Sequence, residues 1–232
     1  MRASFATASS KVKGVKGDGR VFMRKSSFHV EYSISLSEEG DSMKFEFRER
    51  KAAQAAAFLL SLNRGRMKYM TLIKLMYLAD RQSLIETGQP ITGDRMVSMP
   101  NGPVLSMVLD AINSGKRPYS TNAWHEYVSM PEKYMVRLQK DVQQEADYDE
   151  LSPYNIGVLR RVFATFGKKS QWALVRYTHT LPEWDDPQGS SRPIDPATIL
   201  RESGKSDAEI ERVAQRAEAN AFFRSLEGRL VV

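Results

Sequence analysis

The chain has 232 residues, of which 41% are hydrophobic, which is enough for one well-buried core in a single main domain. It contains no cysteine, which excludes disulfides, thiolate metal ligands and a thiol nucleophile. Its longest apolar runs, such as residues 55–60, are far shorter than the roughly 20 residues that a membrane-spanning helix needs. We therefore expect a cytoplasmic protein that does not cross a membrane.

The formal net charge of +6 is concentrated at the N-terminus. Residues 1–25 hold seven Lys or Arg and one Asp, so the remainder carries 34 − 7 = 27 basic and 28 − 1 = 27 acidic residues. Neutralisation of phosphates supplies most of the non-specific affinity of proteins for nucleic acid. Because the remainder has no net charge, we do not expect nucleic acid as a partner of the domain.

The composition divides the chain into three parts. Residues 1–42 are rich in Ser, Gly and Lys, which predicts a flexible basic N-terminal extension, although the alternating residues 28–36 are also compatible with a strand. Residues 43–190 are expected to form a helical domain that begins at Met43. Residues 191–232 are expected to form a C-terminal helical extension that packs on the domain or on a partner.

The first half of the domain is predicted to contain a strand and three helices. Residues 43–47 alternate like a strand, and residues 48–62 form an alanine-rich amphipathic pattern. Residues 68–86 are apolar around most of the helical circumference, which places this helix in the middle of the core. After a Pro-Asn-Gly-Pro turn, Pro103 is predicted to begin a helix that ends at Gly115.

The rest of the domain and the C-terminal extension are predicted to contain one strand and four helices. Residues 134–138 are the best strand candidate, with residues 95–99 as a possible partner strand. Four helices are predicted after this strand, and their starts are indicated by Ser or Asp as the N-cap residue or by Pro at the first helical position. They are predicted at residues 153–166, at residues 171–177 with Trp172 buried, from Asp195-Pro196 to Gly204, and at residues 207–226. The predicted fold class is mainly α, a compact helical domain of about six or seven helices with a small two- or three-stranded β element.

Charged side chains interrupt the apolar helix at residues 68–86. Lys74 and Asp80 project about 120° apart around the helix axis, and Arg81 follows directly. A charge on a buried helix must reach solvent or a partner. These side chains could reach solvent by snorkelling and form an internal ion pair, or they could contact a functional partner. We favour snorkelling and the internal ion pair.

The sequence offers little that could carry chemistry. The three histidines, His29, His125 and His179, are too far apart for a metal-binding motif, and no phosphate-binding loop is present, so we expect no cofactor or metal. His179 lies between threonines at a predicted helix end. It could serve as a general base, but a histidine that bonds a carbonyl at the helix end is the simpler interpretation.

Three blocks in short succession carry a family resemblance. They are residues 74–81 (KLMYLADR), residues 88–95 (GQPITGDR) and residues 101–104 (NGPV). Together with a looser match around His179 and Trp184, they resemble the Panacea domain of SocA-like antitoxins and related phage-associated proteins. The residues that carry the resemblance are Lys74, Tyr77, Asp80, Arg81, Gly93, Asp94, Arg95, Gly102, Pro103, His179 and Trp184.

The resemblance implies a compact helical antitoxin that directly binds a toxin encoded by a neighbouring gene, in a toxin–antitoxin system. Different members neutralise unrelated toxins, and in one branch the antitoxin also delivers its toxin to a cellular protease. The family supplies no catalytic residues, so the protein is not expected to be an enzyme. Its shared residues would hold the fold or face the partner. Asp94 and Arg95 in particular could cap neighbouring helices.

Specificity for the toxin is expected in the variable surface, which comprises residues 117–150, the loop around Trp184 and the last helix. That helix carries apolar residues at helical spacing. They include the candidate partner-binding residues Ile210, Val213, Ala217, Phe222 and Phe223. The stripe would pack on its own domain or, if the helix is detached, enter a groove on a partner.

Two alternatives belong to other functional classes. A DNA-binding regulator of its own operon rests on the basic residues 1–25 alone. An enzyme of unrecognised class would require His179, Asp94 and Arg95 to meet in one pocket, because acid–base partners must lie within hydrogen-bond reach.

Overall fold

The computed structural model describes residues 43–114, 123–140, 142 and 145–230. The predicted N-terminal extension, the possible strand at residues 28–36 and His29 lie outside the described residues. So do parts of residues 117–150.

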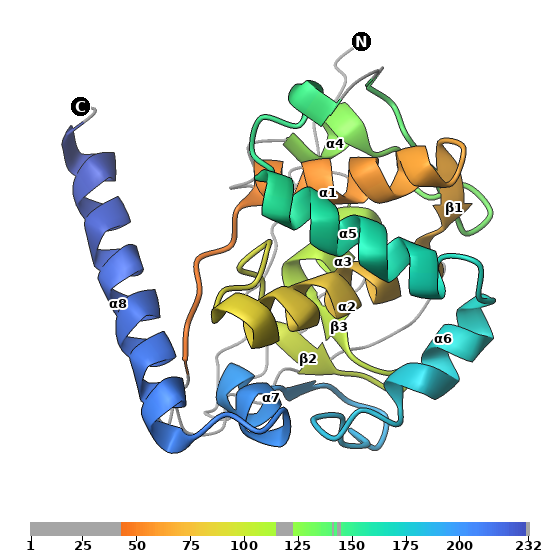
Figure 1. The fold of residues 1–232 in the computed structure, drawn as a ribbon. Helices are drawn as coiled ribbons and strands as arrows, with labels where there is room; N and C mark the ends of the chain where they lie inside the picture. Colours follow the sequence, from red (N-terminus) through yellow and green to blue (C-terminus); the bar gives the residue numbers. More distant parts are fainter. Residues whose placement is uncertain (1–42, 115–122, 141, 143–144, 231–232) are drawn as a thin grey trace, which may run out of the picture.

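The described residues form eight α-helices, one short 3₁₀ helix and two small antiparallel sheets, which confirms the predicted mainly α fold with a small β element (Figure 1). The helices are α1 (Glu49–Leu62), α2 (Tyr69–Thr87), α3 (Ser106–Ser114), α4 (Ala123–Tyr127), η1 (Glu145–Asp147), α5 (Pro153–Phe166), α6 (Gln171–Thr178), α7 (Pro196–Glu202) and α8 (Asp207–Leu230).

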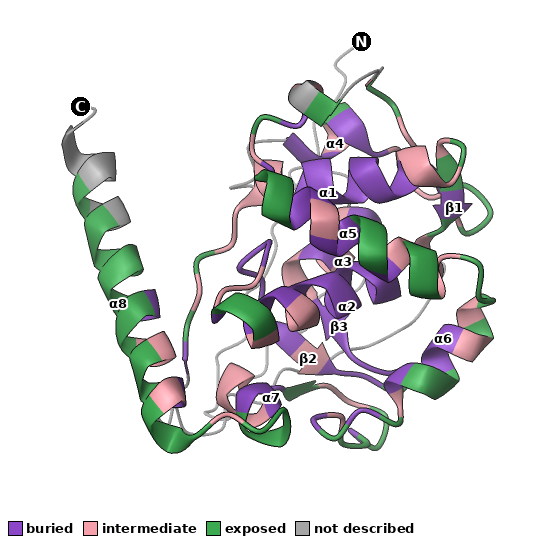
Figure 2. Cartoon of the chain, viewed as in Figure 1, coloured by how far each residue is buried: buried purple, intermediate pink, exposed green. Residues whose placement is uncertain are grey.

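Helix α2 is the centre of the core. Every residue from 72 to 80 is buried, as the apolar pattern around its circumference predicted (Figure 2). Helices α1, α5, α6 and α7 all pack against it. Helix α1 contributes a continuous buried run at residues 52–60, in which four of the five residues from 53 to 57 are alanines that permit close approach. Helix α2 is therefore in contact with several other helices of the protein.

The two sheets join segments that are distant in sequence. Strand β1 (Arg66–Lys68) pairs with β4 (Met135–Arg137), and β2 (Met96–Ser98) lies between β3 (Val104–Leu105) and β5 (Arg192–Pro193). The predicted pairing of residues 134–138 with residues 95–99 is wrong. The turn at residues 99–102 returns the chain so that residues 96–97 pair locally with β3, and a local pairing costs less loop entropy. Strand β4 instead places Val136 opposite Met67, and both are buried.

Three further expectations fail locally. Residues 43–47 form no strand but an extended segment. Val104 and Leu105 belong to β3, so the helix predicted from Pro103 begins only at Ser106. Trp172 is 55% exposed rather than buried, because Leu174 and Val175 form the buried face of α6.

The predicted helix ends are largely confirmed. Gly88, with φ of 75°, ends α2 in the left-handed conformation that favours glycine. Ser152 and Asn155 form a reciprocal capping box at the start of α5. Ser170 and Asp195 cap α6 and α7 by accepting backbone N–H bonds. Helix α8 follows the Ser206–Glu209 cap and extends to Leu230, beyond the predicted end.

Gly93 lies against the backbone of the segment that precedes α1. Substitution of this glycine measures how rigid the contact is. A Cβ at Gly93 would lie 2.0 Å from the carbonyl oxygen of Glu46, whereas a Cβ at Gly189 would meet no atom within 4 Å; both glycines have positive φ. We expect Gly189→Ala to lose about 1–2 kcal/mol from left-handed strain alone. Gly93→Ala should lose more than about 4 kcal/mol of unfolding free energy in urea titrations. Equal losses would show that the close approach is not rigid.

Candidate functional site

Lys74 binds the turn at residues 99–103 from inside the core. Its side chain has no exposed surface, and its Nζ donates to the Pro103 carbonyl at 2.8 Å. The expected snorkelling to solvent is therefore wrong. Burial lowers the pKa of Lys74 to about 7. A Cβ at Gly102 would lie 3.0 Å from this Nζ, so glycine, here with φ of 86°, lets the turn close over the amine.

Tyr77 and Arg81, one helical turn apart on α2, share one carboxylate. The Tyr77 hydroxyl donates to Oε1 of Glu183 at 2.8 Å, and Arg81 donates to Oε1 at 2.7 Å and to Oε2 at 3.2 Å. The Glu183 side chain is fully buried. Burial and then the Glu183 charge raise the pKa of Tyr77 well above its ordinary value. Sequence analysis missed Glu183. No sequence pattern indicated it, because Glu183 lies more than 100 residues from Tyr77 in the chain.

Asp80 binds the segment that follows α2. Its carboxylate accepts from the Thr92 backbone N–H at 3.1 Å and from the Thr92 hydroxyl. The internal ion pair expected for this helix is made by Arg81 with Glu183, whereas Lys74 donates to a backbone carbonyl on another side of the helix. Burial raises the pKa of Asp80 to about 7, although its bonds to Thr92 oppose the shift. Thr92 is thus a structural partner that sequence analysis did not single out.

Asp94 caps the N-terminus of α3, which is one of the two roles expected for this residue. Its two carboxylate oxygens accept from the backbone N–H groups of Met107 at 2.9 Å and Val108 at 2.8 Å. Burial raises the pKa of Asp94 to about 6. Arg95 is exposed, and its guanidinium lies 3.8 Å from the sulfur of Met107. Of this adjacent pair, Asp94 is therefore structural and Arg95 faces solvent.

His179 and Trp184 form a stacked pair over the same turn. Their ring centroids are 4.0 Å apart with planes inclined by 13°, and the indole N–H donates to the Met99 carbonyl at 3.1 Å. His179 is the C-cap residue of α6, and its ring bonds the Pro100 carbonyl. Its Nε2 is covered and has no hydrogen-bond partner in the described part of the chain. Burial and then the Lys74 charge lower its pKa.

Two of the three residues of the hypothetical enzyme site are engaged by other parts of the fold. Asp94 is bonded to the start of α3, Arg95 points to solvent, and His179 lies against Trp184 and the Pro100 carbonyl. A general base needs a lone pair that a substrate can reach. The covered Nε2 of His179 thus favours a structural role for this histidine.

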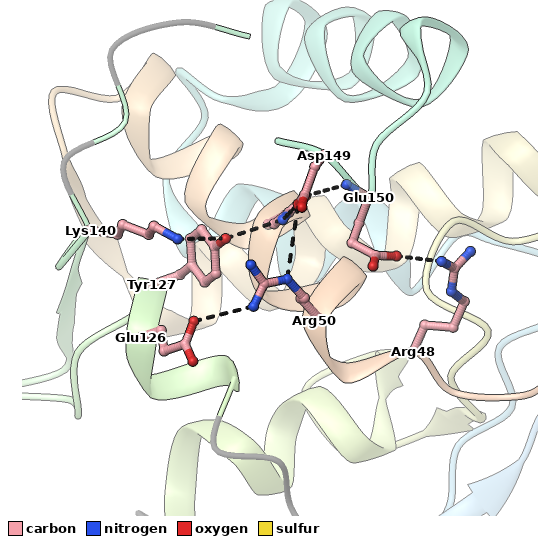
Figure 3. A network of polar contacts seen from close by, with 8 residues as sticks. Arg48, Arg50, Glu126, Tyr127, Lys140, Asp149 and Glu150 are labelled. Carbon is pink, nitrogen blue, oxygen red and sulfur yellow. Dashed lines mark hydrogen bonds and ion pairs between the residues drawn. The ribbon is translucent and has the colours of Figure 1, made fainter. Parts of the chain in front are cut away.

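A second polar network joins α1 to the α4 region (Figure 3). The buried side-chain amide of Gln54 donates to the Tyr127 hydroxyl at 3.1 Å and to Asp149, and its oxygen accepts from the Glu150 N–H at 2.9 Å. Lys140 lies 4.5 Å from the centre of the Tyr127 ring. Part of the region expected to vary with the toxin is thus anchored to α1.

Among the residues that the structure describes, helix α8 packs on the domain through its first half (Figure 2). Ile210 and Ala217 are buried, and Val213 lies over Gly88, where a Cβ would meet its Cγ2 at 2.7 Å. Further along, Phe222 and Phe223 are 60% and 62% exposed. The candidate partner-binding residues therefore divide into three that pack on the domain and two that face outward.

Comparison with known families decides the assignment. Residues 72–185 match the model described as antitoxin SocA-like, Panacea domain. This stretch, which is just under half of the chain, is therefore similar to the Panacea domain. No curated protein and no solved structure matches the chain. In the described residues, no helix is long and apolar enough to span a membrane.

The matched range begins in the first turn of α2 and ends just after Trp184. It contains all eleven residues on which the resemblance rests. All of them except Arg95 make the internal contacts described above or are the glycines that permit close approach. The Panacea motif is therefore largely a set of contacts that close loops over α2. Helix α1 lies outside the matched range although it forms part of the same core.

Asp80 predicts a pH dependence of the stability of the domain. Because its folded pKa is raised, the folded state holds a proton between about pH 4 and pH 7 that the unfolded state releases, so this contribution to stability falls as the pH rises. The difference in unfolding free energy between wild type and Asp80→Asn should decrease over this range by up to about 4 kcal/mol. Glu202→Gln, at an exposed acid, should preserve the wild-type slope. Parallel curves for wild type and Asp80→Asn would contradict the prediction.

The Glu183 carboxylate can be compared with its neighbour Asp185. Glu183→Ala leaves the phenol of Tyr77 and the guanidinium of Arg81 without their acceptor, which should cost about 3–5 kcal/mol in urea unfolding. Asp185 is 73% exposed and pairs with Arg192 at the surface, so Asp185→Ala should cost less than about 1 kcal/mol. A small loss for Glu183→Ala would mean that Arg81 finds solvent instead.

Proposed function

We propose that this protein is an antitoxin that neutralises a protein toxin, encoded by a neighbouring gene, by binding it directly and covering its active surface. The match of residues 72–185 to an antitoxin family carries the proposal. The geometry agrees with it. Five charged or polar residues of the motif form hydrogen bonds inside the domain, namely Lys74, Tyr77, Asp80, Arg81 and Asp94. This arrangement suits a scaffold that binds its partner through other residues.

The outward end of α8 is a candidate surface for the toxin. A helix that is fixed at one end and presents aromatic side chains at the other can enter an apolar groove. Phe223 is 62% exposed and follows the exposed Phe222. An exposed apolar patch of this kind indicates a candidate surface for a partner. Attachment of the first turns, through Ile210 and Ala217, would hold the outward turns in a defined direction.

Co-expression in bacteria tests the proposed function. Expression of the neighbouring gene alone should arrest growth, and co-expression with this protein should restore growth and yield a complex that co-purifies. Immunoblotting of the toxin separates occlusion, in which its level is unchanged, from delivery to a protease, in which its level falls. Toxicity without rescue or binding would refute the antitoxin function.

The contribution of α8 is tested in the same assay. Phe223→Asp should weaken rescue and lower affinity by about tenfold or more, because exposed aromatic anchors often dominate binding energy. Arg212→Asp, at an exposed position earlier on the same helix, serves as the control and should rescue as well as wild type. Full rescue by Phe223→Asp would remove this surface from the interface.

A further inference from the structure

Charge is unevenly distributed over the domain. Residues 151–182 contain five Lys or Arg and no Asp or Glu, although the chain beyond residue 25 has equal numbers of basic and acidic residues. This stretch comprises α5, α6 and the turn between them. Residues 43–190 hold 20 Lys or Arg and 16 Asp or Glu, so these five cations account for the whole net positive charge of the domain.

Two of the five cations are compensated by acids from elsewhere in the fold. Arg160 pairs with Glu145, and Arg161 pairs with Glu86 at 2.8 Å. The other three, Lys168, Lys169 and Arg176, are exposed, and none of them has an ion-pair partner among the residues that the structure describes. The positive charge that remains open is thus confined to the turn before α6 and to α6 itself.

Aromatic side chains lie among these cations. Trp172 is 55% exposed and stands one helical turn before Arg176, so the two side chains share a face of α6. Tyr177 is 39% exposed, and its ring centroid lies 4.7 Å from that of Phe166. We name as the α6 patch the residues Lys168, Lys169, Trp172, Arg176 and Tyr177.

The α6 patch is presented on a fixed element. Leu174, Val175 and Thr178 are buried on the opposite side of α6, which packs on α2. The loop that follows is held by Glu183 and by the stacked pair of His179 and Trp184. A rigid surface loses little conformational entropy when it binds. In Figure 1, α6 lies on the side of the domain away from α8.

The size of the patch decides between two kinds of partner. Nucleic-acid binding depends on the number of phosphates neutralised, and firm binding uses about 6–10 of them, whereas the α6 patch offers three open cations. Single strands also need successive stacking platforms, but the Tyr177 ring already contacts Phe166, which leaves Trp172. Trp, Tyr and Arg are instead the residue types that dominate protein–protein interfaces. An acidic protein surface fits better.

We propose that the α6 patch binds the toxin through a surface that combines carboxylates with an apolar contact for Trp172. This inference rests on the proposed function and specifies the chemistry of its partner. The carboxylates pair with Lys168, Lys169 and Arg176, while the indole supplies buried apolar area. The patch is a different surface from the outward end of α8, so each can be altered without the other.

The experiment uses the full chain and, as probe, the purified protein encoded by the neighbouring gene. Calorimetric titration compares wild type with Lys168→Glu/Lys169→Glu, Trp172→Ala and Arg176→Glu. Each should weaken binding by about tenfold or more, and wild-type affinity should fall as NaCl rises. Arg66→Glu/Lys68→Glu changes the charge equally at exposed positions of β1 and should bind within about twofold of wild type. Circular dichroism melting confirms that every variant is folded.

The outcomes separate the two proposals. If wild type binds the probe and all patch variants bind equally well, the α6 patch is refuted and the antitoxin function stands. If wild type neither binds nor rescues growth, the antitoxin function fails, and the inference about the patch fails with it. A 20-nucleotide single-stranded DNA is titrated in parallel. Loss of DNA binding in the variants, with the protein probe still bound, would assign the patch to nucleic acid and overturn the inference.

Discussion

The structure depends on one constraint, which is that the most buried helix also carries polar and charged side chains. Removing an ammonium or a carboxylate from water costs several kilocalories per mole unless a partner replaces the lost hydration. Helix α2 meets this requirement at separate places around its axis. Lys74 holds the Pro103 carbonyl, Asp80 holds Thr92, and Tyr77 and Arg81 hold Glu183. Each partner belongs to a different loop, so α2 specifies where three loops must lie.

These loops in turn position the outer elements. The segment at Thr92 leads into Asp94, whose carboxylate caps the N-terminus of α3. The loop at Glu183 continues from α6 toward β5. Gly93 allows close approach to the Glu46 carbonyl, and Gly102 allows close approach to the Thr178 side chain. Charged residues grouped in a short motif can also belong to an active site. In this domain the same residue types build a scaffold, and the surfaces suited to a partner lie on α6 and α8.

Sequence reasoning located the elements better than their partners. Helices α2 and α5 were predictable because their apolar periodicity is long and their ends carry Gly88 and Ser152. The partner of β4 was not, because strands of three residues hold too little pattern to distinguish β1 from β2. Trp172 was misplaced because a short helix has two faces and its hydrophobicity alone favoured the inner one. Glu183 was missed because a buried carboxylate becomes recognisable only when Tyr77 and Arg81 are seen beside it.

The attachment of α8 also bears on local unfolding. Backbone amides exchange with solvent through openings whose free energy reflects the contacts that must be broken. The buried contacts of α8 are made by Ile210, Val213 and Ala217, with Gly88 beneath Val213. Its early turns are thus tied to the stability of the whole domain, whereas its later turns can fray while the core remains closed. A partner that ordered the far end of α8 would therefore extend the cooperative unit of the protein outward along this helix.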